Sequence, residues 1–460
     1  MTPDDLLTAL KQRKLELDCF EMTVVQNSSA KPICYKGRGY IRQGENDTLS
    51  FKLYASETKN TDAFANLKQA FGAASGRLFA DDEYYTLAAR TSDGAQWTTD
   101  RVLIDCDWTS FASNPIVTGG IFFLSAEKAT PSGTHSIRVY FFDDVELPYT
   151  LMSKTEIDGR ASFTRSLAKF MVGNIEFSVR REAFGFLVEA KSATVLDEHL
   201  DTRIQESMRY ITGKNVAARV ILRNGLNERT EIRSAPARAA KTHLDPPLLP
   251  NHIGSFEDGW RLFSSYIKYV METSPHPYMH RSSYYLYNAC EASAGSFDLW
   301  AVGVSVAVEG LANLIPRQIT REEKRTLVKL RKSVVDHILS YPCFQSFAER
   351  VKGLFGMMFN VSVRDRLKPL VESGNVAAEH VDAWSELRNK HVHPKDIDLR
   401  KLTSGDYQEM LDLIHKVTVL MYHITFFLNG YTGKFTDYAA SNWPTRDYPW
   451  PPRVEPPASA

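Results

Sequence analysis

The sequence predicts an α+β protein of several domains, in which a β-rich N-terminal module precedes an all-α helical bundle. Short segments rich in β-branched and aromatic residues, separated by turn residues, fill the first half of the chain. Longer segments with apolar residues at helical spacing fill the second half. A stretch with four prolines separates the two, and 460 residues are enough for two or three domains.

These patterns place the β-rich module at residues 1–235, in one or two subdomains, and a Pro-rich linker at 236–254. The helical domain follows at 255–440. The tail, 441–460, is again rich in proline, and we expect it to be disordered.

Each element is predicted from its local pattern. Strands are expected at 19–25, 32–42, 49–55, 84–90, 120–126, 135–142 and 217–223, with a hairpin at 176–192. A helix at 197–213 should end at Gly213. Later helices are expected at 257–272, 296–315, 321–341, 342–356, 362–374, 376–392 and 406–430, with Gly430 as the last C-terminal cap.

Composition narrows the function. Basic and acidic residues number 55 each, so any nucleic-acid surface must be a local patch. The five cysteines form no C-x-x-C pair, which argues against a disulfide scaffold or a cysteine zinc site and fits a reducing cytoplasm. We find no signal-peptide pattern, no apolar run of membrane-spanning length and no metal-binding spacing, so we expect a cytoplasmic protein without a cofactor.

The segment Glu386–Pro394, ELRNKHVHP, concentrates polar residues where a helix should end. Arg388 and His393 have the spacing of a catalytic signature, an arginine followed after four to six residues by a histidine. With 31 arginines and 12 histidines, chance gives about two such pairs, and the chain has three. Arg238–His243 lies in the linker and Arg331–His337 within one regular helix. Pro394, in contrast, should stop the helix and let His393 turn back toward Arg388.

A single charge upstream supports this choice. Glu309 is the only charged residue between Leu299 and Ile315, in a helix that is otherwise apolar and therefore expected to be buried. A carboxylate there is costly unless it is paired or reaches solvent. We expect Arg388 to pair with it; the alternative is that Glu309 lies on a solvated strip.

On these residues, region 255–435 resembles the HEPN domain (higher eukaryotes and prokaryotes nucleotide-binding). The resemblance is carried by Arg388, Asn389 and His393 as R-N-x-x-x-H, by the preceding WSEL, and by the upstream helix with Glu309. A β-rich module followed by such a domain is similar to the ApeA-type abortive-infection proteins of anti-phage defence.

The resemblance implies a metal-independent endoribonuclease, in which the 2′-hydroxyl of the RNA attacks the adjacent phosphate and leaves a 2′,3′-cyclic phosphate. His393 would move the proton, and Arg388 would stabilise the phosphate charge. Asn389 would orient the pair or bind phosphate, and Glu309 would hold Arg388. The resemblance also implies RNA, including tRNA, as substrate, a homodimer with a composite site, and a phage-derived trigger sensed by the N-terminal module.

Weaker candidates for RNA contacts are Arg321, Arg325, Lys329 and Lys332, which share one helix face, together with Lys390 and His391. For the helix face, a solvated outer surface is the commoner interpretation. His391 fits the spacing less well, and we expect it to be exposed or auxiliary. Two other hypotheses stay open: a non-catalytic HEPN module that binds a nucleotide or RNA or dimerises, and a scaffold in which Arg388 and His393 cap a helix.

Overall fold

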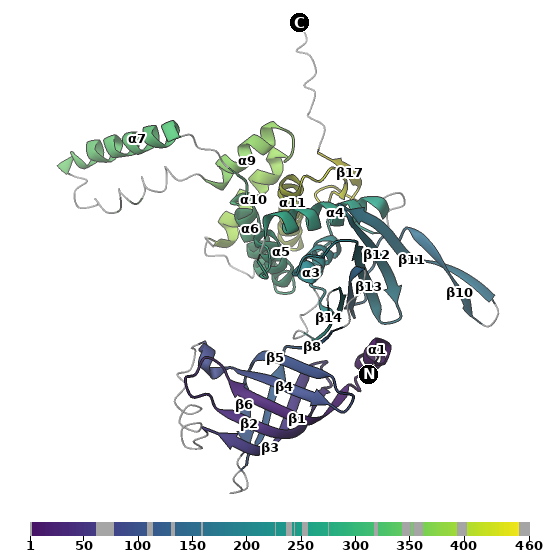
Figure 1. Ribbon diagram of the computed structural model, residues 1–460. Coiled ribbons are helices and arrows are strands. Elements are labelled where there is room, and N and C mark those ends of the chain that lie inside the picture. Colours follow the sequence, from purple (N-terminus) through teal and green to yellow (C-terminus); the bar gives the residue numbers. More distant parts are fainter. Residues whose placement is uncertain are drawn as a thin grey trace. The chain divides into compact units, whose positions relative to one another are not determined.

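The chain is α+β, with a 15-stranded sheet in its N-terminal half followed by helices (Figure 1). This computed structural model describes residues 2–60, 78–107, 114–129, 134–157, 160–225, 227–235, 242, 244–250, 256–274, 276–316, 321–342, 350, 353, 362–392 and 403–449. The chain forms two compact units. Unit 1 is Met1–Gln205 with Val216–Ala239, and unit 2 is Glu206–Asn215 with Ala240–Ala460.

All strand pairs described in the sheet of unit 1 are antiparallel. Its order is β10-β11-β12-β13-β9-β14-β15-β8-β5-β4-β1-β2-β3-β7-β6. The strands are β1 (Glu16–Gln26), β2 (Cys34–Gln43), β3 (Leu49–Lys59), β4 (Tyr85–Thr91), β5 (Gln96–Val102), β6 (Ile104–Asp107), β7 (Ile116–Ile121), β8 (Phe123–Lys128), β9 (His135–Phe141), β10 (Leu151–Ile157), β11 (Arg160–Val172), β12 (Ile175–Glu182), β13 (Gly185–Ser192), β14 (Ala218–Asn224) and β15 (Glu228–Arg233).

The helix α1 (Pro3–Lys11) and the short 3₁₀ helix η1 (Asp81–Glu83) belong to unit 1, whereas α3 (Leu200–Thr212) begins in unit 1 and continues into unit 2 from Glu206. The threonine before α1, Thr2, accepts from Asp5 N and forms a capping box that starts the helix. The leucines of α1 then pack into the core of the β1–β8 strands. As predicted, α3 ends at Gly213, whose φ of 62° is the left-handed conformation that glycine adopts without strain.

Two strand details show how the sheet bends. The strand predicted at 120–126 is wrong, because it is interrupted at Phe122, which is 74% exposed. The segment before this break, β7, pairs with β3, while β8 after it pairs with β5 and β15. Strand β2 has a bulge: the register with β3 shifts between Lys36 and Gly37, where a Cβ on Gly37 would meet Tyr54 O at 2.0 Å.

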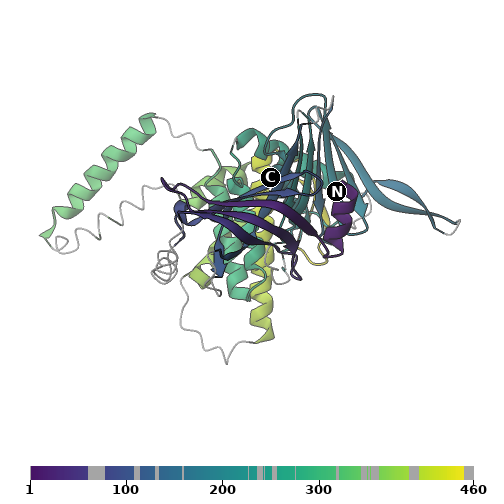
Figure 2. The same ribbon diagram turned by 60° about the horizontal axis from the view of Figure 1, so that its bottom comes forward.

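Unit 2 is a helical bundle with a small sheet. Its helices are α4 (Phe256–Thr273), α5 (Arg281–Ala292), α6 (Phe297–Ala312), α7 (Arg321–Leu339), α9 (Val363–Glu372), α10 (Ala378–Val392) and α11 (Ser404–Asn429); its strands are β16 (Gly433–Thr436) and β17 (Thr445–Tyr448). The sequence did not predict α5. Contacts join α6, α10 and α11 to one another, and Figure 2 shows the long yellow-green α11 among the green helices.

The central helix of this bundle is α11. A capping box at Thr403 starts it, and Gly430, with a φ of 66°, ends it as predicted. By length and composition α11 is apolar enough to cross a membrane, but 67% of its most apolar window is buried inside the protein. A helix at the core of a helical bundle has the same length, apolar composition and burial.

Both Pro-rich segments are more ordered than predicted. Leu244 and Leu248 of the predicted linker are buried in unit 2, where Pro247 O accepts from Thr436 N at 3.0 Å. In the predicted tail, β17 pairs with β16, so disorder is wrong for residues 441–449, while 450–460 lie outside the described residues. Most of the helix predicted at 342–356 also lies outside them.

Candidate functional site

The candidate site is built on α6 and α10, which run antiparallel. Trp384 Nε1 on α10 donates to Ser305 O on α6 at 3.0 Å. One turn of α10 beyond Arg388, His391 Nδ1 lies 3.0 Å from Asp298 Oδ1, near the start of α6. From the first contact to the second, the residue number rises along α10 and falls along α6, so the two helices run in opposite directions.

The predicted pair of Arg388 and Glu309 is confirmed as a contact. Arg388 Nε lies 3.3 Å from Glu309 Oε2. Helical side chains lean toward the N-terminus of their own helix, so in an antiparallel pair these two lean toward each other. The side chains are 35% and 41% exposed, which places the pair at the solvent edge of the bundle.

The expectation that α6 is buried on all sides is wrong. Leu299 is 58% exposed and Val306 is 50% exposed, and the two residues lie two turns apart on the same face of the helix. The opposite face is buried, with Val304, Val308 and Leu311 each 0% exposed. The helix therefore turns an apolar strip to solvent beside Glu309.

His391 is not exposed, so that part of its prediction is wrong. Its side chain is only 12% exposed, and Asp298, which is 75% exposed, holds its Nδ1. The other ring nitrogen, Nε2, is buried and has no hydrogen-bond partner among the described residues. A carboxylate on Nδ1 favours the tautomer with a proton there and leaves Nε2 as the proton acceptor. Asp298 was not among the predicted site residues.

The neighbours of Arg388 differ in how freely they face solvent. Asn389 is exposed. Lys390 is bound by two carboxylates: its Nζ lies 2.8 Å from Glu386 Oε1 and 2.8 Å from Glu409 Oε1. These hydrogen bonds raise the pKa of Lys390. Its charge is already matched inside the protein, which weakens the prediction that it binds RNA.

The basic face of α7 is exposed as far as it is described. Arg325, Lys329 and Lys332 are exposed, and the side chain of Arg321 lies outside the described residues. Two apolar residues of this helix are exposed as well, Val328 at 60% and Leu330 at 51%. Among the described side chains, those of Arg325, Lys329 and Lys332 form no ion pair or hydrogen bond with Arg388 or Glu309.

His393, the proposed proton carrier, lies outside the described residues, as does Pro394. The helix that leads to them, α10, ends at Val392, in agreement with a stop before the proline. Among the described residues, no group of three His, Cys, Asp or Glu side chains is placed to hold a metal ion.

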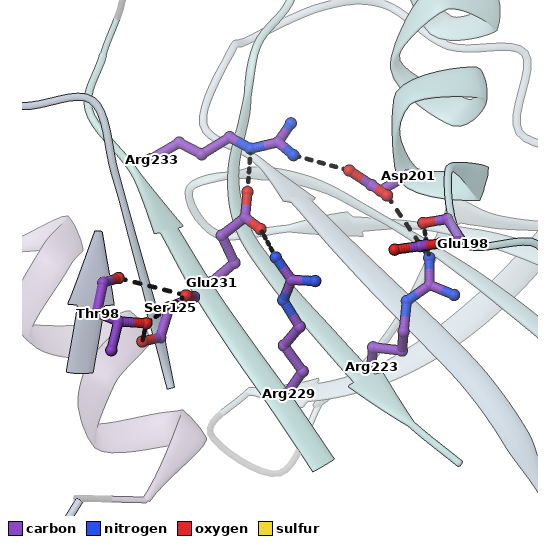
Figure 3. Close-up of polar contacts among 8 residues, drawn as sticks. All are labelled: Thr98, Ser125, Glu198, Asp201, Arg223, Arg229, Glu231 and Arg233. Carbon is purple, nitrogen blue, oxygen red and sulfur yellow. Dashed lines mark hydrogen bonds and ion pairs between the residues drawn. The ribbon is translucent and has the colours of Figure 1, made fainter. Parts of the chain in front are cut away.

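Unit 1 has a polar cluster of its own, which the sequence did not predict. Figure 3 shows Arg229 and Arg233 on either side of Glu231, with Arg233 and Arg223 pointing to Asp201 at the start of α3. They line a cleft of about 210 Å³.

The charges of this cluster are matched within it. Burial alone would lower the pKa of Arg233, but Glu231 and Asp201 outweigh burial and raise it. Arg223 is also tied to the backbone, donating to Asp197 O and Glu198 O at 2.9 Å. The cluster therefore fastens the start of α3 to β14 and β15.

Comparison of the chain with protein-family models, curated proteins and solved structures finds no match.

Proposed function

We propose that unit 2 is a metal-independent endoribonuclease of the HEPN type. The observation that supports this most is the Arg388–Glu309 pair at a solvent edge, with the His391–Asp298 pair on the same two helices. Arg388 and His391 lie on neighbouring turns of α10 and offer a phosphate-binding cation and a proton carrier on one helix. The sequence resemblance adds His393 and Asn389 to this set.

In the proposed reaction, a histidine removes the proton of the RNA 2′-hydroxyl, and the oxygen attacks the adjacent phosphorus. The bond to the 5′-oxygen breaks, that oxygen takes up a proton, and a 2′,3′-cyclic phosphate and a 5′-hydroxyl result. Arg388 binds the phosphate oxygens as negative charge builds up on them, and Glu309 fixes the direction of its guanidinium. His393 is the proposed base. His391, two residues earlier in the sequence, is the competing candidate.

The proposal includes a homodimer. The apolar strip of Leu299 and Val306 lies on α6 next to Glu309, on the side left uncovered by the rest of the unit. A second copy of the chain packed on this strip would place two Arg388–Glu309 pairs near a two-fold axis. In this cytoplasmic defence protein, unit 1 would sense a phage-derived trigger, a role that rests on the resemblance to ApeA-type proteins.

The test is to express the wild type beside His393→Ala and to sequence cellular RNA ends. The wild type should produce new ends with 2′,3′-cyclic phosphates, and His393→Ala should not. With purified protein, EDTA should leave the cleavage unchanged. Equal RNA degradation by both proteins contradicts the proposal, and nucleotide binding without cleavage favours the non-catalytic module instead.

A further inference from the structure

A pocket of about 800 Å³ lies in unit 2 at the start of α6. The residues lining it come from five separate parts of the chain: Thr212, Lys214, Thr242, Leu244, Asp245, Pro246, Ser293, Gly295, Ser296, Phe297, Trp300, Leu411, His415 and Trp443. Its volume is that of a typical small-molecule site, and such sites combine apolar walls with a few polar groups.

Flat rings form much of its wall. Phe297 is 40% and Trp443 37% exposed, so both present ring surface to the opening. The His415 ring centroid lies 5.7 Å from that of Trp443 and 6.2 Å from that of Trp300. Burial lowers the pKa of His415, so its imidazole is neutral near pH 7. Neither of its ring nitrogens makes a hydrogen bond to another described residue, which leaves one donor and one acceptor available.

Trp443 is held in place at a conformational cost. Its φ is 48°, and that of Asn442 is 64°, so two consecutive residues other than glycine are left-handed. For a bulky residue this is an outlier, and it persists only where the surroundings enforce it. Here Trp443 N donates to Ala440 O at 3.2 Å, and the ring lies edge-on to Tyr438, with centroids 5.3 Å apart.

We propose that this pocket binds an unpaired base of the RNA strand, stacked on Phe297 and Trp443. The proposal rests on the proposed function, and it names how that site would select its substrate. Unpaired bases are recognised by stacking on aromatic rings and by hydrogen bonds to their edges, which the His415 imidazole would make.

Two features connect the pocket to the candidate site and to a nucleic acid. Phe297 directly precedes Asp298, whose carboxylate holds His391, so a base in the pocket places its neighbouring phosphate near α10. Lys214 is exposed in the lining and makes no ion pair with another described residue, so its ammonium is available to a phosphate. The pocket thus recognises a single-stranded or looped segment and excludes a paired base.

The test uses the full-length protein and a short single-stranded 2′-O-methyl oligonucleotide with one 2-aminopurine. The blocked 2′-oxygens prevent the proposed cleavage, so binding is measured alone. Binding should quench the 2-aminopurine fluorescence. Phe297→Leu and Trp443→Leu should each weaken binding about 5- to 150-fold and remove the quenching. Tyr284→Leu, an exposed aromatic outside the pocket, is the control and should bind as the wild type does.

The variants must melt within a few degrees of the wild type, and Phe297→Leu decides the case if Trp443→Leu does not fold. Unchanged affinity and quenching in Phe297→Leu, or absence of quenching in the wild type, overturns the pocket. RNA cleavage is measured separately on unmodified RNA. Cleavage without base stacking leaves the proposed function intact and removes the pocket; stacking without cleavage supports the pocket and contradicts the nuclease.

Discussion

Arg388 and Glu309 meet across the antiparallel helices α6 and α10, with 3.3 Å between the guanidinium Nε and the carboxylate Oε2. Both side chains are more than a third exposed, so water screens the attraction. An ion pair in this setting contributes about 0.2–1 kcal/mol to stability. The pair is therefore a poor device for holding two helices together, and its better use is to hold a guanidinium in a fixed direction at the surface.

This distinction can be measured with Arg388→Ala. We expect the free energy of unfolding to change by less than about 1 kcal/mol, because the pair is exposed. RNA cleavage should fall at least about 100-fold, because a charge-stabilising donor is lost from the transition state. Arg364→Ala is the matched control, since Arg364 is an exposed arginine of the same unit, paired with Asp382 at 3.3 Å. A large loss of stability with unchanged cleavage would instead support the scaffold hypothesis.

A second experiment should distinguish the roles of His391, on α10, and His393, which follows that helix in the sequence. His393→Ala should lower the cleavage rate by about 10²–10⁴-fold, the usual contribution of a general base. His391→Ala and Asp298→Asn should have smaller and similar effects on the rate, because they act on one pair. Single-turnover cleavage with saturating RNA measures the step directly. If His391→Ala and Asp298→Asn abolish cleavage while His393→Ala retains it, the two histidines exchange roles.

The fold was predictable where the chain follows a simple period. Strands such as β1 and β9 and helices such as α4 and α11 were expected within a few residues, and glycines ended α3 and α11 as expected. The sequence failed where burial does not follow apolar character. In β15, the last strand in chain order, Ile232 is the one aliphatic residue, and the charges of Arg229, Glu231 and Arg233 neutralise one another.

The candidate site was predictable only in part. Glu309 was informative because it is the single charge in an apolar stretch, and an expensive charge requires a partner. Asp298 was not informative, because the helix dipole favours an acidic residue in the first turn of a helix whether or not that residue has a function. The aromatic pocket depends on five segments far apart in the sequence, and no local pattern brings Trp443 to Phe297.

The exposed strip of α6 leads to a prediction about assembly. Val306→Asp places a charge in the proposed two-fold interface and should convert a dimer to a monomer, because an unpaired charge cannot be buried cheaply. Cleavage should be lost with the dimer. Light scattering after gel filtration measures the mass of each variant. Val195→Asp, at a valine of unit 1 that is 69% exposed, should leave both mass and cleavage unchanged. A wild type that is monomeric while it cleaves RNA contradicts the composite site.

The basic face of α7 is tested by its salt dependence. If Arg325, Lys329 and Lys332 contact RNA phosphates, changing all three to Gln should flatten the dependence of log K on log salt by about two to three. If they form a solvated face, both slope and affinity stay as in the wild type. Fluorescence anisotropy of labelled RNA between 50 and 300 mM salt, on the order of the physiological range, separates the two outcomes.

The last prediction concerns acid stability and rests on a buried histidine. His423 is 1% exposed, with ring centroids of Phe435 and Tyr448 4.6 and 5.1 Å away. Both of its ring nitrogens are buried without a hydrogen-bond partner among the described residues. Burial first, and the nearby His380 second, lower the pKa of His423 to about 3. The folded protein therefore keeps this ring neutral where an unfolded chain would protonate it.

The sign follows from that difference. Above the unfolded pKa, about 6.5, neither state binds the proton and stability is complete. As pH falls from there toward 3, the unfolded state binds a proton that the folded state does not bind. The free energy of unfolding therefore falls by about 1.4 kcal/mol per pH unit. Urea unfolding followed by helical circular dichroism at pH 7, 6 and 5 should show this decline. His423→Phe suits the aromatic surroundings and should reduce the slope, whereas His337→Phe, on exposed α7, should not. Equal slopes in His423→Phe and the wild type would show that His423 is not the group responsible.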